Sequence, residues 1–398
     1  MKLFNQKSQK EDPSNLVSAV QGNTRFALDL YQKLRGTDGN LFFSPYSIST
    51  ALAMTYAGAR EDTQAQMAQA LHFLLDQQQL HQAFTLLGAN LEQAGKKGHV
   101  QLKVANTLWP RTGQKFLKKY LALVKKSYGV RITPIDYGDE EAARHTINSW
   151  VEERTESRIK DLIAPGVLDR STRLVLVNAI YFKGLWTSQF DQNLTGEAPF
   201  WITPDNQVQV STMNQKHDFK VGEGDGLQIL ELPYAGEALS MIVLLPREKD
   251  GLVKLEGSLT SENLDSWIKG LTETEVELSL PSFELAFPFR LDDTLKSMGM
   301  LDAFSEKADF SGLDGTRELF IGAVLHKAFI AVNEQGTEAA AATAVVMQTK
   351  SLSFPPVVFC ADHPFVFLIR KNSTGSILFI GRLTNPTFST PPPPRCAP

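Results

Sequence analysis

The chain has 398 residues, of which 42% are apolar and 21% charged, and its net charge at pH 7 is -4. These proportions are typical of a soluble globular protein with a large core, so extensive disorder is not expected. A nucleic-acid partner usually requires a strongly basic surface, and the slightly acidic balance argues against one.

The two cysteines, Cys360 and Cys396, are too few for a disulfide framework, and no Cys/His cluster has zinc spacing. We therefore expect two independent thiols, no metal and no cofactor. The start, MKLFNQKSQKEDPSN, lacks the apolar region of a signal peptide, and no apolar run reaches the ~18 residues of a membrane-spanning helix. The compartment stays open: the protein is cytoplasmic or is exported by a route that this sequence does not reveal.

Helices dominate the first half of the chain, after a polar segment 1–15 that is expected to be disordered. Apolar residues recur at helical spacing from Gln21 to Leu34, and Ser44 and Pro45 supply an N-cap and a first-turn proline for a second helix. Further helices are predicted over 60–98 (two or three short ones), 115–127 and 141–163, and strands over 101–109 and 174–182.

Strands dominate the second half of the chain. They are predicted over 207–213, 216–222, 227–233, 239–245, 275–287, 365–370 and 377–383, with helices over 260–270 and 291–299. No linker or repeat divides the chain, so we expect one α+β domain over 16–388. The proline-rich tail 389–398, with Pro391–Pro394, is either a solvated extension or a docked brace or partner ligand.

The predicted helix 115–127 is basic and amphipathic. Its lysines are Lys115, Lys118, Lys119, Lys125 and Lys126. Such a stripe is either a solvated helix face or a contact for a glycosaminoglycan or another polyanion.

Common enzyme motifs are missing from the sequence. It contains no G-x-S-x-G, H-E-x-x-H or G-x-x-x-x-G-K-[ST] pattern, so a hydrolase or nucleotide-binding enzyme finds no support. The glycine pattern GEGDG at 222–226 lies between two predicted strands and indicates a hairpin turn. His326 lies among apolar residues, where a histidine is usually a hydrogen-bonded core residue.

The segment 333–356, NEQGTEAAAATAVVMQTKSLSFPP, has no ordinary structural role. Its alanines favour a helix by local propensity. However, the residues before and after it are predicted strands, and a helix here would have almost no apolar face beyond alanine with which to dock. The segment therefore suits an extended loop better than a packed helix.

Residues 334–343 follow the hinge pattern of the serpin family nearly residue for residue, and the chain resembles that family elsewhere. The stretches NLFFSPYSISTALAMTYAGAREDT (40–63), LVNAIYFKGLW (176–186), SMGMLDAFSEKADFSGL (297–313), HKAFIAVNEQGTEAAAAT (326–343) and DHPFVFLIRKNSTGSILFIGRLTNP (362–386) are similar to family motifs in the right order. The resemblance spans about residues 20–386. It implies three β-sheets, eight or nine helices and an exposed reactive-centre loop at about 334–355.

The resemblance also implies a mechanism. In the family, a serine protease cleaves the loop and becomes acylated, and the freed arm inserts as a new strand into the main sheet. The hinge positions here are Glu334, Gly336, Thr337, Glu338, Ala339, Ala340, Ala341, Ala342 and Thr343. Small residues with a period of two, no proline before Lys350, and a flexible glycine all suit strand insertion. Residues 337–350 extend roughly 46 Å at about 3.3 Å per residue.

Counting along the family's hinge places the scissile bond between Lys350 and Ser351. Lys350 is also the only basic residue between Val332 and Pro356. A lysine there fits the acidic specificity pocket of a trypsin-like serine protease, which would form a covalent acyl complex with a monomeric inhibitor.

Other family positions carry over one at a time. Ser44, Ser47, Asn178 and His326 match a polar cluster under the main sheet that governs its opening, and Trp186 and Glu334 match the region where the loop first inserts. One departure is that Ser282 stands where the family often has a lysine able to pair with the glutamate. A serpin-fold carrier or chaperone is the alternative to an inhibitor, although this hinge, apart from Glu334 and Glu338, lacks the bulky, charged or proline residues expected of one.

Overall fold

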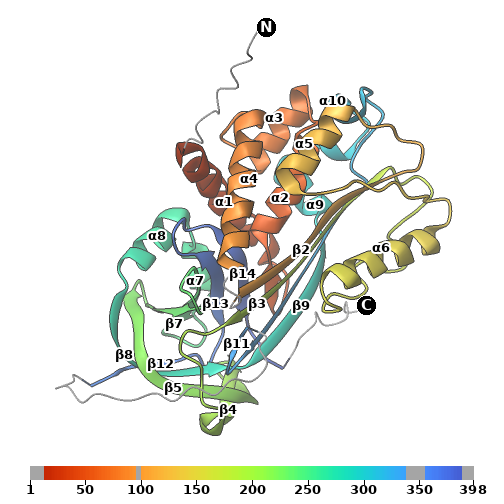
Figure 1. The fold of residues 1–398 in the computed structure, drawn as a ribbon. Coiled ribbons are helices and arrows are strands. Elements are labelled where there is room, and N and C mark those ends of the chain that lie inside the picture. Colours follow the sequence, from red (N-terminus) through yellow and green to blue (C-terminus); the bar gives the residue numbers. More distant parts are fainter. Residues whose placement is uncertain (1–12, 96–99, 338–354, 388–398) are drawn as a thin grey trace.

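The computed structural model describes residues 13–95, 100–337 and 355–387. These residues form helices that pack against two hydrogen-bonded strand networks (Figure 1). Its α-helices are α1 (Pro13–Leu34), α2 (Pro45–Tyr56), α3 (Glu61–Ala70), α4 (Gln77–Gly95), α5 (Lys118–Tyr128), α6 (Glu140–Arg154), α7 (Leu252–Ser258), α8 (Ser261–Lys269), α9 (Asp292–Ser297) and α10 (Ser311–Asp314). The described residues thus form ten α-helices, of which α9 and α10 have only six and four residues.

The strands alternate with these helices along the chain. They are β1 (Leu41–Phe43), β2 (Val100–Pro110), β3 (Leu174–Leu185), β4 (Gly196–Thr203), β5 (Asn206–Gly224), β6 (Leu227–Pro233), β7 (Leu239–Pro246), β8 (Thr272–Pro281), β9 (Phe283–Arg290), β10 (Ala323–Asn333), β11 (Gly336–Thr337), β12 (Val357–Cys360), β13 (Phe365–Lys371) and β14 (Ile377–Leu383). The predicted hairpin turn in GEGDG lies between β5 and β6, and Asp225 and Gly226 there have positive φ angles of 54° and 79°.

One network is a five-stranded sheet with the order β2-β3-β11-β10-β9. The helix α6 packs on one of its faces through apolar side chains such as Ile147 and Val151, which share a cluster with Tyr181 of β3. The helix α2 lies against the other face, and Figure 1 shows α6 and α2 on opposite sides of the sheet. A strand entering this sheet therefore meets packed side chains on both faces.

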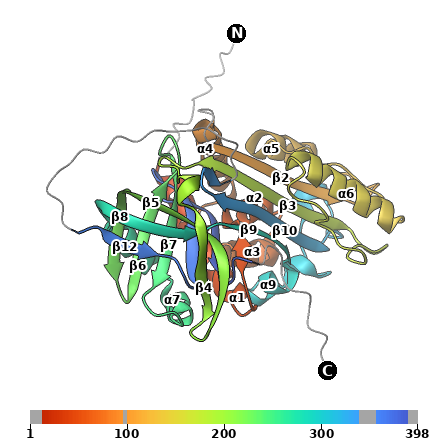
Figure 2. The same cartoon turned by 90° about the horizontal axis from the view of Figure 1, so that it is seen from below.

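The second network has nine strands, with the order β1-β14-β13-β7-β6-β5-β8-β12 and β4 paired to β5. The long strand β5 joins two parts of it, because its beginning pairs with β4 and its end, Lys220–Gly224, pairs with β6. Dividing the network at β5 gives the second and third sheets that the sequence implied. Figure 2 shows β5, β6, β8 and β12 together on one side of the molecule, opposite to α5 and α6.

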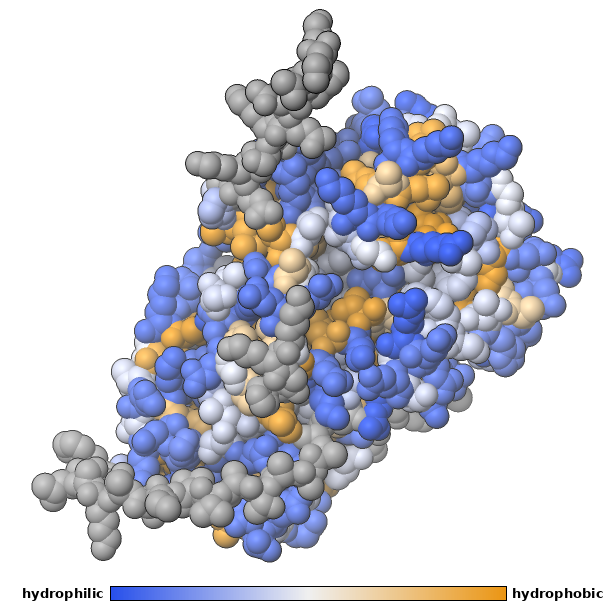
Figure 3. Space-filling view, viewed as in Figure 1, coloured by the Kyte–Doolittle hydropathy of each residue, from blue (hydrophilic) through white to orange (hydrophobic). Residues whose placement is uncertain are grey.

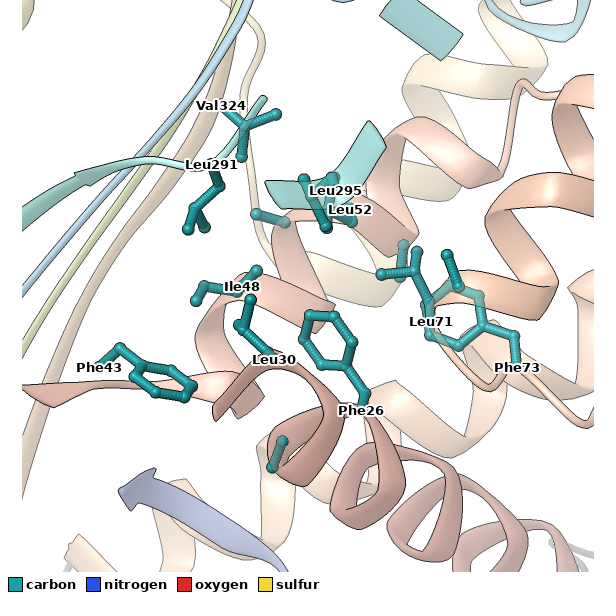
Figure 4. Packing of buried hydrophobic residues seen from close by; sticks show 14 of the residues in the cluster. Phe26, Leu30, Phe43, Ile48, Leu52, Leu71, Phe73, Leu291, Leu295 and Val324 are labelled. Carbon is teal, nitrogen blue, oxygen red and sulfur yellow. The ribbon is translucent and has the colours of Figure 1, made fainter. Parts of the chain in front are cut away.

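The largest part of the core lies between α1, α2 and the sheets (Figure 4). Phe26 and Leu30 of α1 meet Ile48 and Leu52 of α2 in this cluster, and all four are at most 1% exposed. The helix α2 is buried nearly all round and begins as predicted, with the Ser44 hydroxyl accepting a hydrogen bond from the Ser47 amide. The helix α1 begins at Pro13. Residues 13–15, which were predicted to be disordered as part of the segment 1–15, are therefore helical.

Candidate functional site

The chain turns sharply at the end of β10 and runs back as the two-residue strand β11. Gly336 pairs with Asn333 of β10 and with Leu185 of β3, and Thr337 pairs with Val332 and with Gly184. Both pairings are antiparallel. Gly336 and Thr337 of the predicted hinge therefore already lie between β3 and β10, at one end of the five-stranded sheet.

Asn333 and Gly336 shape this turn. The Asn333 side-chain oxygen accepts hydrogen bonds from the amides of Gln335 (3.1 Å) and Gly336 (3.2 Å), as asparagine does in tight turns. Gly336 has a φ angle of 154°, and a Cβ atom there would stand 2.0 Å from the Gly184 carbonyl oxygen. Only glycine fits this position.

Trp186 holds the turn from the side of β3. Its indole N–H donates to the Asn333 carbonyl oxygen (3.0 Å), and its amide donates to the Gln335 carbonyl oxygen (2.9 Å). Its ring stacks on Tyr234 with 4.6 Å between centroids, and the Tyr234 hydroxyl lies 2.9 Å from the Thr337 hydroxyl oxygen. Thr337 is fully buried, so this hinge side chain points into the protein.

Glu334 is fixed through its backbone. Its carbonyl oxygen accepts a hydrogen bond from the Phe190 amide (2.8 Å), and no ion pair of its carboxylate occurs among the residues described here. Ser282 donates both its amide and its hydroxyl proton to the Ser211 carbonyl oxygen, at 2.9 and 3.2 Å. Ser282 is therefore used within the sheets and does not replace the family's lysine.

Beyond β11 the sheet is closed. β3 and β10 pair directly and in parallel from Val175–Tyr181 to Ala323–Phe329. A strand that continued β11 into the sheet would have to separate these seven pairs.

The predicted polar cluster lies under this closed part of the sheet. Asn178 and His326 are register partners, and the His326 Nδ1–H donates to the Asn178 side-chain oxygen. His326 Nε2 accepts a hydrogen bond from the Ser44 amide (3.1 Å), and the Asn178 amide group donates to the Ser47 hydroxyl oxygen (2.6 Å). All four residues are at most 1% exposed. The cluster ties β3 and β10 to the start of α2.

Burial lowers the pKa of His326 to about 3, so its ring is neutral at physiological pH. The Ser44 amide can only donate, which requires an unprotonated Nε2 and leaves the proton on Nδ1. Protonating the ring would therefore break the bond to α2 as well as place a charge in the core.

Three residues of the hinge turn and the polar cluster were not predicted from the sequence: Asn106, Tyr234 and Asn333. Asn106 is the register partner of Asn178 on β2, accepts a hydrogen bond from the Ser47 hydroxyl (3.2 Å), and donates to the Ser47 carbonyl oxygen (3.3 Å). In the alternating pattern of this strand, Asn106 lies on the same face as Leu102 and Leu108. A polar residue on an otherwise apolar face was the feature that could have identified it. Nothing in the sequence marked Tyr234.

The remaining predicted site residues are not part of the described structure. Glu338, Ala339, Ala340, Ala341, Ala342, Thr343, Lys350 and Ser351 fall in 338–354, between Thr337 and Pro355. The described chain resumes into β12, which pairs in parallel with β8 at the edge of the second network. The strands on either side of this segment, β11 and β12, thus belong to different strand networks.

The five lysines of the basic stripe lie on α5 or just before it, and all are exposed. Within the described residues, no group of three or more histidine, cysteine or acidic side chains could hold a metal ion. None of the helices described here combines the length and hydrophobicity needed to cross a membrane.

The family model described as "Serpin (serine protease inhibitor)" matches residues 21–386. The human leukocyte elastase inhibitor is 44% identical over 376 residues, which cover 92% of this chain and 98% of the relative. A structure of uncleaved ovalbumin superposes with a TM-score of 0.84 at 31% identity, covering 93% of this chain and all of the other. Human thyroxine-binding globulin in complex with its ligand gives a TM-score of 0.86 at 32% identity, over 94% of this chain and 99% of the other.

Proposed function

The chain belongs to the serpin family of serine protease inhibitors, and we propose that it traps a trypsin-like protease by inserting its own cleaved loop between β3 and β10. The observation that carries this proposal is the position of β11. Its two residues already pair with both flanking strands in the antiparallel sense that an inserted arm would need.

The register of β11 can be continued into the sheet. In antiparallel pairing, each step forward along the arm moves the partner one residue back along β3 and along β10. Thr343 would then lie between Asn178 and His326, which are now hydrogen-bonded to each other. Insertion of the arm would thus break the contact at the centre of the polar cluster.

The side chains of the arm suit both faces of this slot. Thr337 points inward, so with a period of two Ala339, Ala341 and Thr343 would follow it, and Ala340 and Ala342 would face α6. Because interiors are close-packed, only small side chains can enter between layers that already touch. The fold is shared with a thyroxine-binding globulin, so it is this small-residue arm that supports inhibition over a carrier function.

The choice of protease rests on Lys350. We propose cleavage between Lys350 and Ser351, since a lysine side chain fits an acidic specificity pocket. A second candidate target is an elastase, because the relative at 44% identity is named for inhibiting leukocyte elastase. Elastase-type pockets are small, and the loop offers Val345 and Val346 to them.

Mixing the intact protein with trypsin and, in parallel, with leukocyte elastase tests both candidates. We expect an SDS-resistant complex with trypsin and release of a peptide that begins at Ser351, identified by mass spectrometry. A complex with elastase alone, and a peptide beginning after one of the valines, would replace the trypsin-like target. Free turnover by both enzymes without a complex would refute inhibition itself.

Along with protease inhibition, we propose three further properties of the protein: its domain boundaries, its oligomeric state and a contact to a polyanion. The functional unit is a single domain over 16–388, since β1 near the start pairs with β14 near the end. It acts as a monomer, because each insertion uses the chain's own loop. The five lysines of the basic stripe offer a weak contact to a polyanion.

A further inference from the structure

A cavity of about 830 Å³ lies between α4 and α5, away from the hinge and the polar cluster. The junction of α2 and α3 closes it at one end, with Ala57 and Arg60 in its lining. Pockets that bind small organic molecules have volumes of roughly 300–1,000 Å³. The cavity therefore has the size of a ligand site.

Each of the two helices presents one face to this cavity. On α5 the lining residues Lys119, Leu123 and Lys126 recur at helical spacing, while Lys118 and Lys125 are not in the lining. On α4 the lining includes His81 and Leu86. The exposed basic stripe of α5 is thus divided into lysines that line the cavity and lysines that do not.

His81 is the unusual member of the lining. It is only 3% exposed, and its Nδ1 lies 2.6 Å from the Tyr128 hydroxyl oxygen. Its Nε2 has no hydrogen-bond partner among the described residues, although buried polar atoms are normally paired. Burial lowers the pKa of His81 to about 4, so the ring is neutral and offers Nε2 as one hydrogen-bonding atom.

The charged side chains that line the cavity are all basic. Arg60, Lys119 and Lys126 belong to the lining, and no acidic side chain does among the described residues. Arg60 donates to the Ala57 and Ala59 carbonyl oxygens, whereas Lys119 and Lys126 have no ion-pair partner in the described part of the chain. An anion would be attracted here, with two lysines available to pair with it.

Apolar side chains complete the wall. Leu86, Tyr120 and Leu123 lie in the lining, and the Tyr120 hydroxyl donates to the Met54 carbonyl oxygen (3.2 Å). Figure 3 shows apolar surface over α5 flanked by hydrophilic residues. The lining also includes uncharged polar side chains such as Gln77, Gln82 and Thr85, so the cavity offers both polar and apolar contacts to a small organic ligand.

We propose that the cavity between α4 and α5 binds an amphipathic organic anion, whose acidic group pairs with Lys119 and Lys126 while its apolar body meets Leu86, Leu123 and the His81 ring. His81 Nε2 supplies a hydrogen bond that fixes the ligand's orientation. The site is independent of the loop, so it holds whether or not the protein inhibits a protease.

Anilinonaphthalene sulfonate, a fluorescent amphipathic anion, is a suitable probe for the full-length protein. Titration followed by fluorescence should give saturable binding, and the uncharged N-phenylnaphthylamine should bind about tenfold more weakly if the anion is recognised. Equal affinity for the charged and uncharged probes would overturn the proposal.

Matched variants on the same helix separate the cavity from general surface charge. The double substitution Lys119→Glu/Lys126→Glu should weaken binding by about tenfold, and Lys118→Glu/Lys125→Glu, with the same net charge, by less than about twofold. Equal losses in both pairs would show a diffuse electrostatic effect and refute the site. His81→Phe should also weaken binding while the far-ultraviolet circular dichroism stays unchanged; if that variant does not fold, the lysine pairs still decide.

Discussion

Gly336 lies against Gly184 so closely that a Cβ atom on Gly336 would stand 2.0 Å from the Gly184 carbonyl oxygen. A Cβ on Gly184 would in turn lie 2.8 Å from the Tyr234 ring. This contact between two glycines is what lets β11 lie between β3 and β10. The hinge is thereby held at the position from which insertion would begin.

Replacing Gly336 by alanine should push β11 out of this position. The overlap is with backbone atoms, which cannot rotate away, so we expect a loss of native stability on the order of 1–3 kcal/mol. Insertion should also start later, so more inhibitor molecules should be cleaved per protease trapped. The stoichiometry of trypsin inhibition and the thermal midpoint measure the two effects.

Gly196→Ala is the control, because Gly196 has no atom within 4 Å of the added Cβ. If both glycine variants behave alike, the contact with Gly184 has no part in inhibition.

Replacing Thr343 by arginine should convert the inhibitor into a substrate. In the continued register, residue 343 lies between Asn178 and His326, where an unpaired cation would be buried at a cost of several kcal/mol. We expect trypsin to cleave the loop with at least a roughly tenfold lower yield of covalent complex, seen on denaturing gels. Thr343→Ala is the control and should still form the complex; retained inhibition by Thr343→Arg would show that the register is wrong.

Glu338 and Lys183 should form an ion pair when the arm is inserted. The continued register makes them neighbours across β11 and β3, on the face opposite to Thr337. Such cross-strand pairs contribute about 0.2–1 kcal/mol. We expect Lys183→Glu to slow complex formation with trypsin by a few fold, as measured by stopped-flow fluorescence.

The exchange of both charges, Lys183→Glu with Glu338→Lys, should restore the rate. A double variant as slow as the single one would exclude the pair.

Acid should destabilise the native state through its buried histidines. The pKa of His326 is lowered by burial to about 3, and that of His81 to about 4, from an ordinary value near 6.5. The unfolded chain then binds more protons than the native one below pH 6.5, so stability falls as the pH decreases from 6.5 toward 3. Each histidine contributes about 1.4 kcal/mol per pH unit between pH 6.5 and its own lowered pKa, which is about 3 for His326 and about 4 for His81.

The variant His326→Gln isolates this effect. Between pH 7 and pH 5 its thermal midpoint should fall less than that of the unmodified protein. His145→Gln, at an exposed position, should not change the slope. Equal slopes for all three proteins would mean that His326 does not control acid stability.

Many helices and strands of this fold could be predicted from the local sequence pattern. The predictions that the structure corrects have identifiable physical causes. The segments 207–213 and 216–222 were predicted as two strands but form the single strand β5, because pairing with β8 from Thr212 to Val221 runs through the polar residues between them. The helix predicted over 141–163 ends at Arg154. There the Thr155 hydroxyl donates to the Val151 carbonyl oxygen and accepts from the Ile159 amide, in competition with the helical pattern.

Some residues of the candidate site could likewise be predicted from local sequence, whereas others could not. Ser44 as N-cap and His326 as a hydrogen-bonded core residue follow from local sequence, and the structure confirms both roles. Tyr234 is more than one hundred residues from Thr337 in the sequence, and only the tertiary fold brings their hydroxyl groups together. The resemblance to the family gave the positions of the hinge, but not the contact between Gly336 and Gly184.

The central claim is that the cleaved arm enters the five-stranded sheet, and a crystal structure of the protein after cleavage by trypsin tests it most directly. We predict a new strand between β3 and β10, with Thr343 between Asn178 and His326. If β3 and β10 still pair directly from Val175–Tyr181 to Ala323–Phe329 in the cleaved protein, the proposed mechanism is contradicted.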